Sequence, residues 1–126
     1  MPEHPLAGRR FLVVEDEYMI ASDLIASLEQ AGAAVFGPVS DLERAMEIVG
    51  ANFPLDGAVL DINLHGKMVY PAARLLSEKG VPIVFVTGYE CHSIPSSFAE
   101  APCLNKPIDE RDLINLLATS ACRAHC

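Results

Sequence analysis

The feature of this chain that most constrains its fold is a regular alternation between short apolar runs and longer amphipathic segments. The runs fall at residues 11–14, 34–36, 57–60, 81–86 and 103–104. Most of them contain Val or Ile, β-branched residues that are typical of strands. The first run, residues 11–14, is apolar at every position, as expected of a parallel strand covered on both faces. Parallel strands need long right-handed crossovers, which helices supply. The alternation therefore predicts one doubly wound α/β sheet of five parallel strands.

The segments between the runs predict helices, because their apolar residues recur at spacings of three and four. These residues are Ile20, Leu24, Ile25 and Leu28 in the first helix, Leu42, Ala45, Met46, Ile48 and Val49 in the second, and Leu113, Ile114, Leu116 and Leu117 in the last. Ser40 and Glu43 have the spacing of a capping box. A further helix is expected over residues 70–77, and Asp109 opens the last one. Residues 88–101 predict a loop with at most a short helix, and Gly37 and Pro38 predict the end of the second strand.

Size and charge narrow the class of protein. The 126 residues suit one domain, and 17 acidic residues against 9 Lys and Arg give a net charge of -8, which repels nucleic acids and anionic membranes. No apolar run approaches the roughly 20 residues of a membrane span, and residues 1–10 lack the pattern of a secretory signal. We therefore expect a cytoplasmic protein without direct nucleic-acid or membrane binding.

The cysteines form no CxxC pair. They are Cys91, Cys103, Cys122 and Cys126. Because a cytoplasmic protein normally keeps its thiols reduced, we expect all four to be free thiols.

Polar residues follow the predicted strands. Glu15 and Asp16 follow the first strand, Asp61 the third, Thr87 the fourth and Lys106 the fifth. In an open α/β sheet, the carboxyl ends of the strands form the ligand site. Three converging carboxylates call for a cation, and oxygen ligands without His or Cys favour Mg²⁺ over zinc. With a lysine and a hydroxyl nearby, the set supplies what phosphoryl transfer needs.

Four motifs at these strand ends resemble the receiver domains of bacterial two-component response regulators, the CheY-like family. They are Val13-Val14-Glu15-Asp16, Leu60-Asp61-Ile62-Asn63, Val86-Thr87-Gly88 and Asn105-Lys106-Pro107. The resemblance spans about residues 9–123 of a single receiver domain, residues 1–126. It implies a flavodoxin-like (βα)5 fold with strand order 2-1-3-4-5.

The resemblance also implies a role for each site residue. Asp61 would accept a phosphoryl group from a sensor histidine kinase or a phosphotransfer protein. Glu15, Asp16, Asp61 and the backbone carbonyl of Asn63 would hold Mg²⁺. Thr87 and Lys106 would bind the phosphate, and the Lys106-Pro107 bond would be cis. Such a domain is a phosphoacceptor that at most catalyses its own phosphorylation and dephosphorylation. It would signal to a downstream protein as a monomer or a phosphorylation-dependent dimer.

Two positions near the site depart from the usual receiver pattern. Receivers commonly carry a Tyr or Phe three residues before the lysine, where this chain has Cys103. The segment from Phe85 to Tyr89 instead resembles an alphaproteobacterial subgroup, often single-domain, that works with HWE-type or related kinases. In this interpretation Thr87, Tyr89 and Cys103 are the switch positions, with Tyr89 replacing the usual aromatic reporter and shielding the phosphoryl group from water.

Other functions fit the residues less well. An Asp-nucleophile phosphatase of the haloacid dehalogenase type has a second Asp where Asn63 stands, and a carrier of FMN would be repelled by the acidic residues 15–17. These acidic residues also suit a simple helix N-terminus. A receiver-like binding module that works without phosphorylation remains open, as does whether the chain is a whole regulator or part of a larger one.

Overall fold

The computed structural model describes residues 4–88 and 91–125, with side chains through residue 119. Its centre is a parallel sheet of five strands. The strands are β1 (Arg10–Val14), β2 (Ala34–Val39), β3 (Gly57–Asp61), β6 (Ile83–Thr87) and β7 (Cys103–Asn105). Their order is β2-β1-β3-β6-β7, which is 2-1-3-4-5 once a small separate hairpin is left out. The predicted doubly wound α/β fold is confirmed.

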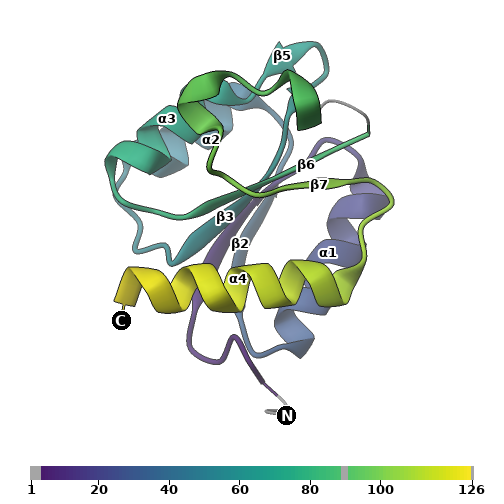
Figure 1. Cartoon of the computed structure of the whole chain (residues 1–126), viewed down its shortest axis with the longest axis vertical. Helices are drawn as coiled ribbons and strands as arrows, with labels where there is room; N and C mark the ends of the chain where they lie inside the picture. The colour runs from purple at the N-terminus through teal and green to yellow at the C-terminus, as the bar shows by residue number, and fades with distance from the viewer. Residues whose placement is uncertain (1–3, 89–90, 126) are drawn as a thin grey trace.

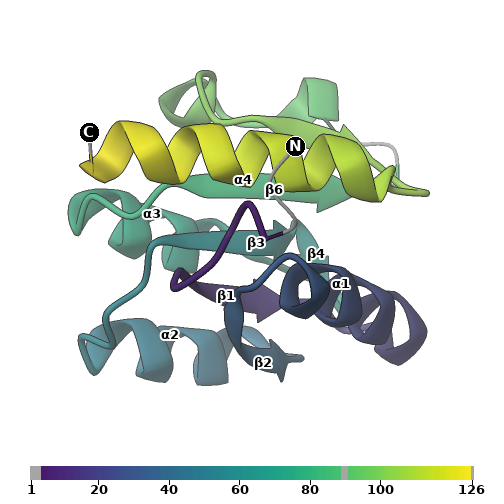
Figure 2. The same ribbon diagram turned by 90° about the horizontal axis from the view of Figure 1, so that it is seen from below.

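Two helices cover each face of the sheet (Figures 1 and 2). α1 (Tyr18–Gln30) and α4 (Glu110–His125) lie on one face, and α2 (Leu42–Gly50) and α3 (Tyr70–Glu78) lie on the other. Within residues 4–88 and 91–125, no helix is both long enough and apolar enough to cross a membrane.

The apolar runs of the strands serve both helix layers. Along β1, Phe11 and Val13 join the core beneath α1 and α4, whereas Leu12 and Val14 join the core beneath α2 and α3. Successive side chains of a strand point to opposite faces, so a strand between two layers must be apolar at every position. The same rule explains why β3 and β6 are buried along their whole length.

β2 is longer than the sequence predicts. The Gly37-Pro38 pair does not end this strand, which continues to Val39, and the pairing with β1 shifts register beside it. Gly37 has a φ of 131°, and a Cβ there would lie 2.6 Å from the carbonyl oxygen of Val13. Glycine therefore allows β2 to bulge past β1 without ending. Beyond the bulge, the Val39 carbonyl accepts a hydrogen bond from Glu15 N at 2.9 Å.

The cap of α2 is one residue later than predicted. Asp41, not Ser40, is the capping residue, and its side chain accepts a hydrogen bond from Arg44 N at 2.8 Å. Both Ser and Asp are good N-caps, so the sequence offered two adjacent candidates of nearly equal quality.

A hairpin that the sequence analysis missed follows β3. β4 (Asn63–Leu64) and β5 (Lys67–Met68) pair antiparallel across His65 and Gly66, where we expected only a loop. Both turn residues have positive φ, 51° and 90°, as a tight two-residue hairpin requires. Histidine at the first turn position gave no sequence signal for this turn.

The segment between β6 and β7 contains two short 3₁₀ turns, η1 (Cys91–Ser93) and η2 (Ser96–Phe98), in agreement with the expected loop. The prediction of free thiols is wrong for two cysteines, because Cys91 and Cys103 form a disulfide. Their separation of 12 residues showed no pairing motif, but the fold returns the chain so that their Cα atoms lie 5.8 Å apart. The Cys122 side chain and Cys126 lie outside the described part of the chain.

Candidate functional site

The candidate site forms where neighbouring strands end at one edge of the sheet. Asp61 ends β3 and is paired with Val86 of β6, and Thr87 ends β6 opposite Asn105 of β7. Glu15 directly follows β1, which pairs with β3. Residues distant in sequence are thus brought to one edge by strand order alone, as the sequence analysis expected.

Three carboxylates meet at this edge. One oxygen from each of Glu15, Asp16 and Asp61 lies within 4.8 Å of the others. Glu15 is 1% exposed and Asp61 is 5% exposed, while Asp16 is half-buried. Negative charges this close and this sheltered from water repel strongly unless positive charge compensates.

Lys106 supplies positive charge to the cluster. Its Nζ lies 3.0 Å from Glu15 Oε1 and 3.5 Å from Asp61 Oδ2, and the side chain is only 13% exposed. The Lys106 backbone N–H donates to the Thr87 carbonyl at 2.7 Å, which continues the β6–β7 ladder up to the site. The Lys106-Pro107 bond is cis, as predicted.

The carboxylates perturb one another's protonation. Burial, reinforced by Glu15 and Asp16, raises the pKa of Asp61 to about 8, although Lys106 opposes the rise. The pKa of Asp16 is lowered. Burial alone would raise it, but the hydrogen bonds with Asp61 and from the His65 N–H outweigh burial. At neutral pH the cluster therefore retains a proton on Asp61, which a bound cation would displace.

The donor set fits a hard divalent cation. All three groups offer carboxylate oxygen, the ligand type that Mg²⁺ prefers. Glu15 Oε1 is buried and accepts no hydrogen bond of good geometry, even though Lys106 is within ion-pair distance. A buried carboxylate oxygen without a hydrogen bond, on a residue that clusters with two other carboxylates, is a group that a bound cation would satisfy. Asn63, whose carbonyl the resemblance adds as a ligand, lies in β4, two residues past Asp61.

Two residues outside the predicted set also contact the site. Glu17 Oε1 lies 3.1 Å from Lys106 Nζ; the sequence analysis treated it only as one of the acidic residues before α1. The His65 backbone N–H donates to Asp16 Oδ2 at 2.9 Å. The acidic run at residues 15–17 gave some signal for Glu17, whereas the role of His65 depends on the unpredicted hairpin.

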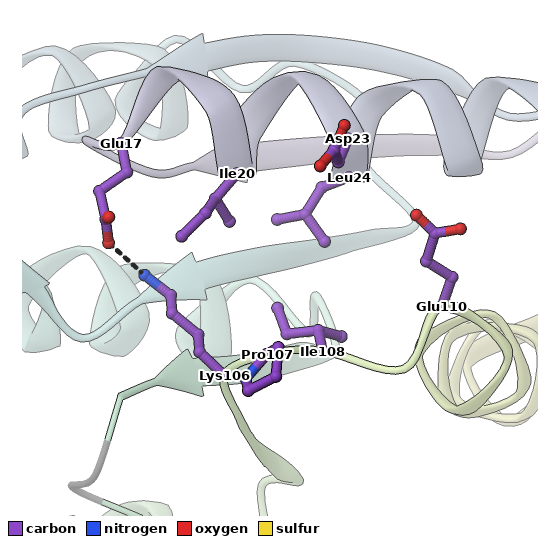
Figure 3. A pocket seen from close by; sticks show the side chains of 8 residues that line it. All are labelled: Glu17, Ile20, Asp23, Leu24, Lys106, Pro107, Ile108 and Glu110. Carbon is purple, nitrogen blue, oxygen red and sulfur yellow. Dashed lines mark hydrogen bonds and ion pairs between the residues drawn. The ribbon is translucent and has the colours of Figure 1, made fainter.

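Lys106 also borders a pocket beside the carboxylate cluster. The pocket has a volume of about 460 Å³ and lies between α1 and the chain entering α4. Figure 3 shows Lys106 reaching across it to Glu17, with Ile20 and Leu24 of α1 facing Ile108. The pocket therefore joins an apolar floor to the charged edge of the site.

The predicted switch positions lie in different surroundings. Thr87 is 2% exposed at the end of β6, and Cys103, at the start of β7, is bonded to Cys91. Tyr89 lies outside the described residues. Behind β6 the structure has an aromatic cluster that the sequence analysis did not single out: the ring centroid of Phe98 is 5.7 Å from that of Tyr70 and 5.6 Å from that of Phe85.

Comparison with known proteins agrees with this architecture. No family model matches the chain. The transcriptional regulatory protein PdtaR of Mycobacterium tuberculosis is 28% identical over 119 residues, which cover 91% of this chain and 58% of PdtaR. The chain thus spans less than two thirds of the curated relatives that it matches.

Three solved structures are similar to nearly the whole chain. A response regulator receiver protein from Sinorhizobium medicae is 24% identical, with a TM-score of 0.81 and coverage of 92% of this chain and 96% of that one. SdrG from Sphingomonas melonis is 34% identical, with a TM-score of 0.78 and coverage of 89% and 95%. The receiver domain of a Pseudomonas aeruginosa sensor histidine kinase, with magnesium coordinated in its active-site cleft, is 23% identical, with a TM-score of 0.74 and coverage of 91% and 98%. The chain therefore has the fold of response regulator receiver domains, and such domains are among its structural neighbours.

Proposed function

We propose that the chain is a two-component response regulator receiver that accepts a phosphoryl group on Asp61 in a Mg²⁺-dependent reaction. One observation carries the proposal: the buried Asp61 carboxylate lies in a cluster with Glu15 and Asp16, and Lys106 Nζ is 3.5 Å from its Oδ2. A nucleophilic carboxylate, acidic metal ligands and a cation at one edge are the parts that phosphoryl transfer needs.

Glu15, Asp16 and Asp61, together with the Asn63 carbonyl, would hold the Mg²⁺. When bound, the ion neutralises charge on the phosphoryl oxygens and on Asp61. The Glu15 backbone N–H donates to the Val39 carbonyl, and the His65 backbone N–H donates to Asp16 Oδ2. Glu15 and Asp16 are thus positioned before any ion arrives.

In the reaction, an Asp61 carboxylate oxygen attacks the phosphorus of a phosphohistidine. A phosphorus–oxygen bond forms as the phosphorus–nitrogen bond breaks, and the imidazole leaves with the electron pair of the broken bond. Lys106 donates charge-assisted hydrogen bonds to the phosphoryl oxygens and Thr87 donates its hydroxyl. Because Lys106 already contacts Asp61 and Glu15, little reorganisation precedes the step.

The proposed partners are those that the resemblance to receiver domains implies. The donor is a sensor histidine kinase, HWE-type kinases included, or a phosphotransfer protein, and the output is contact with a downstream protein. The net charge of -8 opposes direct binding of this chain to DNA, and we place the receiver in the cytoplasm. PdtaR is a transcriptional regulatory protein, and this chain matches only part of it. A role of this chain in regulating transcription is therefore included here as part of the proposal.

Intact-mass spectrometry tests the proposal. The protein is incubated with acetyl phosphate with or without Mg²⁺, beside Asp61→Asn and Asp56→Asn. Asp56 is a matched control because it accepts a hydrogen bond from Arg10 N at the opposite end of β1. A single Mg²⁺-dependent phosphoryl adduct that only Asp61→Asn abolishes supports the proposal. An adduct that survives in Asp61→Asn contradicts the proposal. So does the absence of an adduct with both acetyl phosphate and an active histidine kinase.

A further inference from the structure

The disulfide between Cys91 and Cys103 lies next to the proposed phosphate-binding groups. Cys91 is four residues after Thr87, and Cys103 is three residues before Lys106. In the sheet, Cys103 pairs with Phe85 while Thr87 pairs with Asn105. One covalent bond thus joins the chain leaving Thr87 to the strand leading to Lys106.

The crosslink restrains one particular part of the segment between β6 and β7. Its later part is anchored by Phe98, which is 6% exposed and packs on Tyr70 and Phe85. Its earlier part, η1, contains no buried residue. With the sulfurs separated, packing would still hold Phe98, while η1 would lose its covalent attachment to β7.

Both cysteines are half-buried, so a small thiol or disulfide can reach them. In the oxidation, one thiolate attacks oxidised glutathione, forming a mixed disulfide and releasing one glutathione thiolate. The second thiolate attacks the protein sulfur of that mixed disulfide and releases the other glutathione. The two cysteines lose two electrons and two protons, and oxidised glutathione is reduced to two thiols.

We propose that the Cys91–Cys103 pair is a redox-controlled crosslink that sets how strongly the segment after β6 responds to a phosphoryl group on Asp61. This inference rests on the proposed function. The phosphoryl group draws Thr87 toward Asp61, and the chain following Thr87 must adjust. The disulfide opposes that adjustment by fixing Cys91 to β7, so the reduced protein is the more responsive form.

Thermodynamic reciprocity makes this coupling measurable. If the disulfide weakens the binding of a phosphoryl group by some factor, phosphorylation must shift the thiol–disulfide equilibrium toward the thiols by the same factor. Couplings between two sites in one protein commonly amount to about 5-fold or more. We therefore expect a shift of roughly 5-fold toward the reduced pair.

The experiment measures the ratio of oxidised to reduced pair in glutathione buffers, with Mg²⁺ alone or with Mg²⁺ and beryllium fluoride as a phosphoryl analogue. It uses the full chain carrying Cys122→Ser and Cys126→Ser, so that only the pair reacts. We expect beryllium fluoride to lower the ratio about 5-fold, and to have no effect in the same chain with Asp61→Asn. Cys91→Ser should bind beryllium fluoride as the reduced protein does in every buffer.

Two results overturn the inference: a pair that forms no disulfide in oxidised glutathione, or a ratio that is unchanged while fluorine NMR shows beryllium fluoride bound. The failure of the proposed function looks different. In that case neither redox form binds beryllium fluoride, and the proposed coupling is refuted together with the proposed function. The thiol titration still reports whether the crosslink forms.

Discussion

The segments that follow β3 and β6 leave the sheet side by side, but they are built differently. After β3, Ile62 N donates to the Val86 carbonyl and Val69 N donates to the Ile62 carbonyl, and Ile62, Leu64 and Val69 are buried. After β6, two 3₁₀ turns contribute one buried side chain, Phe98. The first segment is held by backbone hydrogen bonds that reach β6 and by three buried side chains. In the second, the backbone hydrogen bonds of η2 are local, and the attachment to the sheet depends mainly on Phe98, the partly buried Ile94 and Ala101, and the disulfide.

Under the proposed function, this difference separates the residues that carry out the reaction from the segment that responds to it. The hairpin after β3 fixes Asp16 through the His65 N–H, and a metal site gains from ligands fixed beforehand. The segment after β6 begins at Thr87 and has fewer buried contacts, which is the mark of a region that opens or shifts at low cost. We infer that the chemistry is placed on the firmly held side and the signal leaves from the other.

The largest expected effect comes from removing the positive charge of Lys106. Lys106→Ala deletes the positive charge beside Glu15 and Asp61, and losing one such donor slows group transfer by roughly 100- to 1000-fold. Phosphorylation of the variant by acetyl phosphate, followed by intact-mass spectrometry, measures the loss. Lys67→Ala is the matched control, because Lys67 also pairs with a glutamate, Glu43, but is 60% exposed on β5. A decrease of less than about 3-fold in the phosphorylation rate of Lys106→Ala would show that the lysine charge does not assist phosphoryl transfer.

The next largest effect concerns the stability of the segment after β6. The disulfide closes a loop with a sequence separation of 12, and closing such a loop stabilises a fold by about 2–3 kcal/mol. Urea denaturation should show this loss in free energy of unfolding when the protein is reduced. Cys91→Ser should be equally destabilised and indifferent to reductant. Equal stability of the oxidised and reduced protein would mean that the crosslink does not restrain this segment.

A smaller effect concerns how the free energy of unfolding depends on pH through Asp61, which lies on the firmly held side. The folded-state pKa of Asp61 is about 8, against about 3.9 for an unfolded aspartate. Between these values the folded state binds more protons than the unfolded state, so this group makes the fold less stable as pH rises from about 4 to 8. Asp61→Asn removes the charge.

In the absence of divalent ions, Asp61→Asn should therefore stabilise the protein, and the gain should be greater at pH 8 than at pH 5. Three pH units correspond to roughly 4 kcal/mol for a fully buried group, which solvent screening of this edge reduces to about 1–2 kcal/mol. Thermal unfolding of both proteins at the two pH values checks this. Mg²⁺ should stabilise the wild type but have a smaller effect on the variant. A gain that is the same at both pH values would rule out the buried, protonated Asp61.

The two segments also differ in how far the sequence could predict them. The five parallel strands and the meeting of Glu15, Asp61 and Lys106 follow from apolar periodicity and from the rule that parallel strands end at one edge, whereas the strand order was implied only by the resemblance to receiver domains. The hairpin after β3 escaped prediction because its turn depends on the positive φ of His65, a conformation uncommon among residues other than glycine.

The segment after β6 was predicted only as a loop because its structure depends on contacts distant in sequence. The pairing of Cys91 with Cys103 requires the fold that brings them together. The packing of Phe98 on Tyr70 joins this segment to α3. No local periodicity encodes either contact. In this protein, strand ends predict the residues of the candidate site, and tertiary contacts determine the structure of the segment after β6.

Hydrogen–deuterium exchange tests the division between the two segments most directly. Exchange is compared between reduced protein in Mg²⁺ and reduced protein in Mg²⁺ with beryllium fluoride, using peptides that cover residues 62–69 and 91–102. We predict a clear change in exchange in the second peptide and little change in the first. A change confined to residues 62–69, with beryllium fluoride bound and residues 91–102 unaffected, would contradict the account.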